Sequence, residues 1–180
     1  MAESRERSDF HTLLHAQIRS EFTASQQYIA VAVYFDGQDL PQLARRFYSQ
    51  ADEERTHAMM MIQYLLDNDH AVTIPGVDEV DTEFASVREP VELAERQERT
   101  VTDQITMLAR TARDTGDYLG EQFMQWFLKE QVEEVASMTT LLAIADRAGS
   151  NQFDLENFVA REMSSPKDAA GAPSAAGGTI

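Results

Sequence analysis

The sequence contains no cysteine. This excludes disulfide bonds, thiolate zinc sites, cysteine-ligated iron–sulfur clusters and cysteine nucleophiles. Any hard metal must therefore be bound by carboxylate and imidazole groups. Long apolar runs are missing as well: the longest, residues 28–35, is too short to span a bilayer, and residues 1–9 lack the apolar centre of a signal peptide. We expect a cytoplasmic protein with no membrane segment.

Basic residues are scarce. The chain has 15 lysines and arginines against 31 aspartates and glutamates, which gives a net charge of −16. A field of this sign repels nucleic acid and anionic lipid and attracts cations. Solubility alone would also account for such a charge. The spacing of the acidic residues must therefore distinguish a cation-binding protein from a merely acidic one.

Glycine and proline are few, 8 and 5 in 180 residues, and they cluster between long segments with heptad-like apolar stripes. This pattern predicts an all-α protein with five helices. They cover about residues 9–35, 39–68, 86–115, 117–148 and, in a shorter fifth helix, 151–162. The first and third connections are tight turns, whereas residues 69–87 form a long one. Short, long, short connections are typical of a four-helix bundle with one crossover, here between the second and third helices.

Residues 164–180 are rich in alanine, glycine, proline and serine. A segment of this composition cannot bury enough apolar surface to fold alone. We therefore expect one helical domain over residues 1–163 and a disordered tail over 164–180. The apolar terminus at Ile180 could dock on a partner, but a flexible linker is the preferred interpretation.

Polar and ionisable residues lie on the apolar stripes of all four long helices, where side chains point into the bundle. In chain order they are Glu21, Glu54, His57, Glu98, Gln131 and Glu134. A buried carboxylate without compensation is costly or takes up a proton, so several together require a multivalent cation or basic partners. The stripes contain no lysine or arginine. A metal is therefore favoured, and carboxylates with one histidine suit iron or manganese.

The spacing of these residues repeats. Glu21 precedes Glu54 by 33 residues, and Glu98 precedes Gln131 by the same interval. This regularity predicts two equivalent helical hairpins whose half-sites face each other, with Glu54 and Glu98 as bridging ligands of a dinuclear centre. Glu54 and His57 also have the Glu-x-x-His spacing found in di-iron carboxylate bundles.

With these motifs the chain resembles the bacterial non-haem ferritins over residues 9–161. The resemblance implies a ferritin-like bundle that assembles as a homo-oligomer, a hollow shell of twenty-four subunits. It further implies iron storage and detoxification: Fe(II) enters the shell, is oxidised by dioxygen or peroxide at a ferroxidase centre within each subunit, and is kept as a ferric mineral core.

The resemblance also implies roles for individual residues. The first iron would be held by Glu21, Glu54 and His57. The second would be held by Glu54, Glu98 and Glu134, with Gln131 beside it. A third iron site, common in bacterial members, would use Glu53, Glu130 and Glu133. Tyr28 and Trp126 correspond to aromatic residues that can supply electrons during oxidation, although a plain packing role is equally compatible with the pattern.

One departure from related families concerns haem. Bacterioferritins carry a second Glu-x-x-His pair in the fourth helix, and a methionine after the second-helix glutamate ligates haem. Here Gln131 and Glu134 replace the second pair, and Arg55 follows Glu54. We therefore expect no haem.

Two other functions compete with iron storage. A di-iron oxygenase would need a pocket for an organic substrate beside the centre. A non-catalytic helical scaffold would turn its ionic stripes towards solvent or partner chains and would bind no iron stoichiometrically. A very large closed assembly is predicted only by the ferritin hypothesis.

Overall fold

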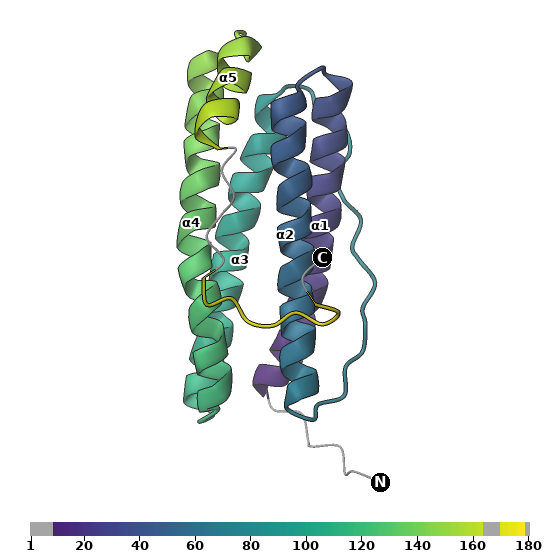
Figure 1. The fold of residues 1–180 in the computed structure, drawn as a ribbon, viewed down its shortest axis with the longest axis vertical. Coiled ribbons are helices and arrows are strands. Elements are labelled where there is room, and N and C mark those ends of the chain that lie inside the picture. The colour runs from purple at the N-terminus through teal and green to yellow at the C-terminus, as the bar shows by residue number, and fades with distance from the viewer. Residues whose placement is uncertain (1–8, 164–169, 179–180) are drawn as a thin grey trace.

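The computed structural model describes residues 9–163 and 170–178. Its regular elements in this part of the chain are all helices, and their ends lie within two residues of the expected ones. They are α1 (Asp9–Gly37), α2 (Pro41–Asp67), α3 (Arg88–Asp114), α4 (Tyr118–Ala148) and α5 (Gln152–Glu162) (Figure 1). The all-α bundle with one long crossover is thus confirmed. None of these helices is both long and apolar enough to cross a membrane.

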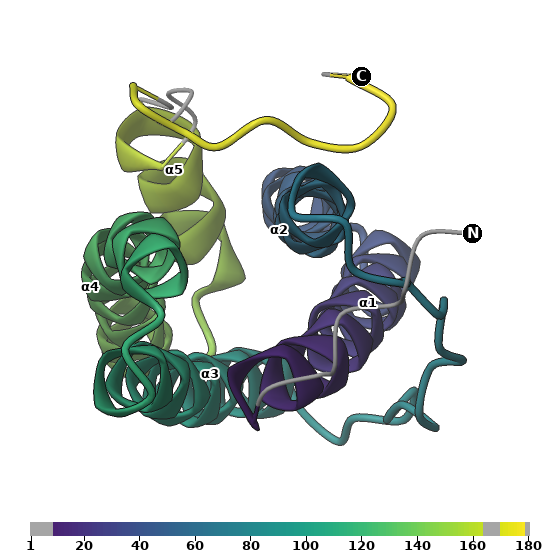
Figure 2. The same ribbon diagram turned by 90° about the horizontal axis from the view of Figure 1, so that it is seen from below.

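Helices α1 and α2 form one hairpin and α3 and α4 a second, packed side by side (Figure 2). The long connection runs along the outside of α1 and returns the chain from the end of α2 to the start of α3 (Figure 1). Two hydrogen bonds of 2.8 Å hold it there, from Gln27 Nε2 to the Asp81 carbonyl and from the Asp81 amide to Gln27 Oε1. An ion pair between Arg19 and Asp78 adds to them.

Helix α5 docks on the start of α2. The N-cap residue of α2, Leu40, offers no side-chain hydrogen bond to the first turn. Instead Glu156, in α5, accepts hydrogen bonds from the backbone amides of Gln42 (2.9 Å) and Leu43 (2.8 Å). An anionic carboxylate is stabilised at a helix N-terminus, where the amides are unpaired and the dipole is positive. This contact therefore both completes α2 and fixes the position of α5.

Two apolar clusters fill the bundle. One contains Phe35 and Phe47, and the other contains Phe10 and Phe127. In the second cluster, Gly120 in the first turn of α4 is required by packing, because a Cβ atom there would lie 2.6 Å from the buried Phe10 ring. The polar residues singled out above lie between the two clusters along the chain, at positions that are also buried.

Residues 170–178 cross the side of the bundle formed by α2 and α4 (Figures 1 and 2). The amide of Ala176 donates a 3.0 Å hydrogen bond to the Met59 carbonyl, and three alanines of the segment pack on the Phe10 cluster. Disorder is thus not observed over residues 170–178, because small side chains let the backbone approach α2. Residues 164–169 and 179–180 lie outside the described residues, and the domain boundary after 163 stays a prediction.

Candidate metal centre

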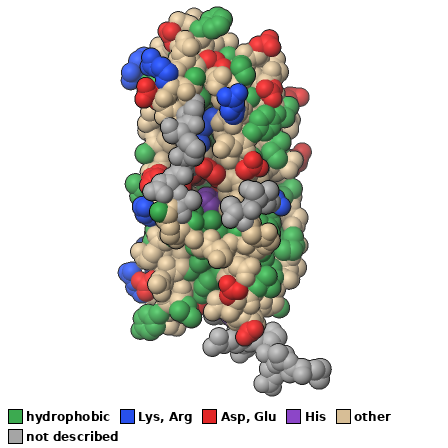
Figure 3. Space-filling model, viewed as in Figure 1, with side chains coloured by type: hydrophobic (Ala, Val, Ile, Leu, Met, Phe, Trp, Pro, Cys, Tyr) green, Lys and Arg blue, Asp and Glu red, His purple; other side chains and the backbone are tan. Residues whose placement is uncertain are grey.

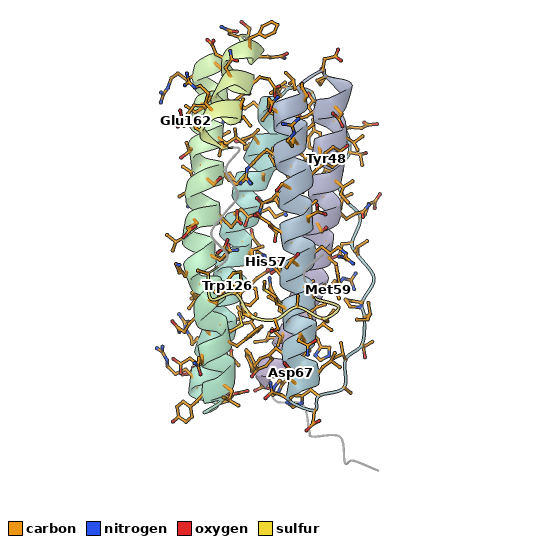
Figure 4. The ribbon with its side chains drawn as sticks, viewed as in Figure 1. Tyr48, His57, Met59, Asp67, Trp126 and Glu162 are labelled. Atoms are coloured by element: carbon orange, nitrogen blue, oxygen red, sulfur yellow. The ribbon has the colours of Figure 1, made fainter. Side chains whose placement is uncertain are left out.

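Glu21 of α1 and Glu54 and His57 of α2 converge inside the bundle. Within residues 9–163 and 170–178 they form the one group of three metal-ligand side chains whose atoms lie within 4.8 Å of one another. His57 Nδ1 lies 3.3 Å from Glu54 Oε2 and 3.9 Å from Glu21 Oε2. All three side chains are buried. Nδ1 is therefore the imidazole nitrogen that faces the carboxylates, and Figure 4 shows His57 about midway along the bundle.

A buried glutamine holds each of these carboxylates. Gln17 Nε2 donates to Glu21 Oε1 at 2.9 Å, and Gln50 Nε2 donates to Glu54 Oε1 at 2.7 Å. The 33-residue offset thus relates two Gln–Glu pairs and not only two glutamates. This role of the two glutamines was not predicted above, although the sequence shows a glutamine four residues before Glu21 and another four residues before Glu54.

The three side chains of this group influence one another's protonation. Burial raises the pKa of Glu21 to about 8, and the neighbouring Glu54 carboxylate adds to the effect. Burial also acts to raise the pKa of Glu54, but hydrogen bonding to His57 and its charge hold that pKa below its usual value. The pKa of His57, which burial alone would lower, rises to about 10 beside Glu54 and Glu21. At neutral pH the metal-free group therefore holds protonated Glu21, ionised Glu54 and imidazolium His57.

The second hairpin supplies Glu98 from α3 and Gln131 and Glu134 from α4, all of them buried. The Tyr28 hydroxyl donates a hydrogen bond to Glu98 Oε1. Burial raises the pKa of Glu98 well above its usual value, and the carboxylates of Glu54 and Glu134 raise it further. The carboxylates of the two hairpins are thus close enough to repel one another, as the predicted facing half-sites require.

These residues fit a bound iron ion. Within the described residues, Glu21 Oε2 and Glu98 Oε2 are buried and make no hydrogen bond. A buried carboxyl oxygen without a partner is costly, and a cation between the hairpins would satisfy both. Carboxylate oxygens and one imidazole nitrogen are suitable donors for Fe(II) and Fe(III).

Both aromatic residues named above lie at the centre. The Trp126 ring is 5.7 Å from the His57 ring, in an edge-on arrangement (Figure 4). Tyr28 is fully buried and packs 5.7 Å from Phe47. Burial raises the pKa of Tyr28 well above its usual value, so its hydroxyl keeps its proton and acts as a donor.

The residues of the expected third iron site lie outside the close cluster. Glu53 and Glu130 are half-buried, on α2 and α4, and Glu133 is exposed. Acidic side chains and a histidine gather midway along the face that carries α2 and α4 (Figure 3). In the described part of the chain, no group of three close ligand atoms includes these glutamates. The third site stays a prediction.

Two histidines, His11 and His15, lie one turn apart near the start of α1. The His11 side chain is buried, and its Nε2 lies 3.7 Å from the Asp117 carboxylate. The centroid of its ring lies 3.7 Å from that of the His70 ring, and the two rings are tilted by 37°. His15 is half-buried, and its Nδ1 lies 2.8 Å from the His11 carbonyl. These contacts tie the start of α1 to the segment after α2 and to the α3–α4 turn.

Comparison with known proteins agrees with the fold. The ferritin-like domain family matches residues 11–148. A ferritin BfrB of Mycolicibacterium smegmatis is 67% identical over 171 residues, covering 95% of this chain and 94% of that protein. A bacterioferritin BfrB of Mycobacterium tuberculosis is 63% identical over 174 residues, covering 97% and 96%. An open-pore ferritin of Archaeoglobus fulgidus superposes with a TM-score of 0.82 at 26% identity, covering 87% and 97%. The chain therefore belongs to the ferritin family.

Proposed function

We propose that this chain stores iron in the cytoplasm as a shell of 24 identical subunits. Each subunit binds Fe(II), oxidises it to Fe(III) at a di-iron centre inside its own bundle, and releases it to a ferric mineral within the shell. One observation carries the proposal: Glu21, Glu54 and His57 converge in the interior opposite buried carboxylates of α3 and α4. Membership of the ferritin family supports it.

The proposed assignment of ligands follows the two hairpins. Glu21, Glu54 and His57 bind the first Fe(II). Glu54, Glu98 and Glu134 bind the second, so that Glu54 is shared, and Gln131 lies beside it. Glu53, Glu130 and Glu133 remain candidates for a third iron, for which their position on α2 and α4 is the only support.

The chemistry follows from the charges of the site. Two Fe(II) ions displace the protons held by Glu21 and His57, and Gln17 and Gln50 keep the first two carboxylates in place. Each ion gives up one electron, and dioxygen takes both and leaves with two protons as hydrogen peroxide. Peroxide can take the next pair of electrons and become water. Anionic carboxylates favour Fe(III) over Fe(II), so the protein contributes proximity and an electrostatic preference for the product.

We also propose that the chain binds no haem, despite the name of its M. tuberculosis relative. Arg55, which follows Glu54, has no thioether, and α4 has Gln131 and Glu134 in place of a second Glu-x-x-His pair. The net charge of −16 supports cations as partners and argues against nucleic acid.

Stopped-flow absorbance tests the function. Apoprotein mixed in air with two Fe(II) per chain should show a fast burst that saturates near that ratio. Glu54→Ala should abolish the burst, whereas Asp52→Ala, an exposed position on the same helix, should keep it. Gel filtration should show a very large assembly for all three proteins. A near-normal burst in Glu54→Ala shells would rule out the assigned centre.

A further inference from the structure

Thr102 lies at the edge of the centre, one turn after Glu98 on α3. Its hydroxyl oxygen is 2.9 Å from Gln131 Oε1 on α4 and 2.8 Å from the main-chain carbonyl of Glu98. Gln131 is 3% exposed, so bulk water does not compete for its amide. Neither the ligand spacing nor the charge pattern of the sequence singles out Thr102.

A hydroxyl has one proton, which Thr102 can give to only one of these two oxygens at a time. The Glu98 carbonyl already has a helical partner in α3, the Thr102 amide. For Gln131 Oε1, by contrast, the hydroxyl of Thr102 is the one donor found among residues 9–163 and 170–178. The structure places Gln131 Oε1, and not Nε2, within hydrogen-bond distance of the Thr102 hydroxyl. Donation from Thr102 to Gln131 Oε1 is therefore the favoured arrangement.

We propose that Thr102 is a positioning residue of the ferroxidase centre. Its hydroxyl holds the oxygen of the Gln131 amide on the α3 side, so that the NH2 group faces the interior. Gln131 then acts as a hydrogen-bond donor to anionic groups at the centre and not as an iron ligand through its oxygen. This inference rests on the proposed function and names the role of one residue within that site.

Variants that remove the hydroxyl group and a variant that keeps it separate the effect of the hydrogen bond from that of side-chain shape. Thr102→Val keeps the branched side chain but removes the hydroxyl, and Thr102→Ala removes both. Thr102→Ser keeps the donor. Loss of one buried hydrogen bond should slow the Fe(II) burst about fivefold in the Val and Ala variants, while the Ser variant should stay close to the wild-type rate. Gel filtration and Co(II) stoichiometry check that shell and ligands are intact.

A double-mutant cycle tests whether Thr102 acts through Gln131. If it does, Thr102→Val should have no further effect in a Gln131→Ala background, because the amide it orients is gone. The orientation itself is tested with azide added to Co(II)-loaded shells, followed by the visible spectrum. Azide affinity should fall in Thr102→Val at unchanged Co(II) affinity, since an anion loses its donor.

The outcomes are distinct. The inference would be overturned if the wild-type shell showed a burst and Thr102→Val matched it in both burst rate and azide affinity. The proposed ferroxidase function would then still stand. Additive effects in the cycle would overturn it too, because Thr102 would then act independently of Gln131. Absence of a burst in the wild-type shell would refute the proposed function itself.

Discussion

The hydroxyl group of Tyr28, on α1, donates a hydrogen bond to the carboxyl group of Glu98, on α3. This hydrogen bond links the two hairpins across the interior. It leaves the other oxygen of Glu98 buried and without a hydrogen-bond partner in the described residues. The carboxylate is thereby oriented before a metal arrives, which reduces the reorganisation that binding of the second iron requires.

Tyr28→Phe keeps the ring beside Phe47 and removes only the donor. We expect the Fe(II) burst to slow by roughly tenfold, because an oriented carboxylate loses a hydrogen bond to a charged group. Stopped-flow absorbance at two Fe(II) per chain measures it. Tyr34→Phe, at a half-buried tyrosine in the same helix, is the matched control. Equal rates in the two variants would show that the Tyr28 hydroxyl has no part in oxidation.

Metal binding should release protons. With pKa values of about 8 for Glu21 and about 10 for His57, both groups carry protons at pH 7 that a metal must displace. We expect Zn(II), a redox-inert probe, to release roughly two protons per chain from this pair. Calorimetry in buffers of different ionisation enthalpy counts them. Apparent affinity should rise between pH 7 and 10, and binding without proton release would contradict the assigned protonation states.

The same shifts set the pH dependence of the metal-free fold. Both native pKa values exceed the ordinary values of 4.5 for Glu21 and 6.5 for His57. The folded chain therefore holds more protons than the unfolded chain between about pH 4.5 and 10, and its stability should fall as pH rises through this range. Each group contributes to this fall only between its ordinary pKa and its pKa in the folded chain, from 4.5 to about 8 for Glu21 and from 6.5 to about 10 for His57. Thermal melting of apoprotein should show this fall, and Zn(II)-loaded protein should show less of it.

Glu156→Gln should loosen α5. The variant keeps the size of the side chain but loses the charge that caps α2 through the amides of Gln42 and Leu43. We expect a loss of about 1 kcal/mol and faster hydrogen exchange in α5. Glu162→Gln, at the exposed end of the same helix, is the control. Unchanged exchange in Glu156→Gln would mean that apolar contacts alone hold α5.

Removal of residues 164–180 should expose the α2–α4 side near Trp126, the only tryptophan of the chain (Figure 4). We expect a red shift of its fluorescence, since a more hydrated indole emits at longer wavelength. Ala176→Pro, which removes the amide that donates to Met59, should give part of the shift. Ala176→Ser keeps this amide and should give none. An unchanged spectrum after truncation would show that the tail does not cover this side.

The helices and the face on which each ligand residue lies could be predicted from the sequence, because helices are periodic. The apolar stripes predicted five helices within two residues of their observed ends. The spacing of Glu54 and His57 placed both side chains on one face, and the 33-residue offset paired Glu21 with Glu54. Local geometry determines each of these relations, so the stripes and intervals were sufficient.

Contacts between segments far apart in the chain could not be predicted from the sequence and are seen only in the tertiary structure. Glu156 caps a helix that begins 115 positions earlier, Ala176 reaches Met59, and Thr102 meets Gln131 across two helices. The proton on Glu21 likewise depends on burial and on the charge of Glu54 beside it. No periodicity encodes such relations, because hydrogen bonds and pKa shifts depend on distances through space and on exclusion of water, which exist only once the helices have packed.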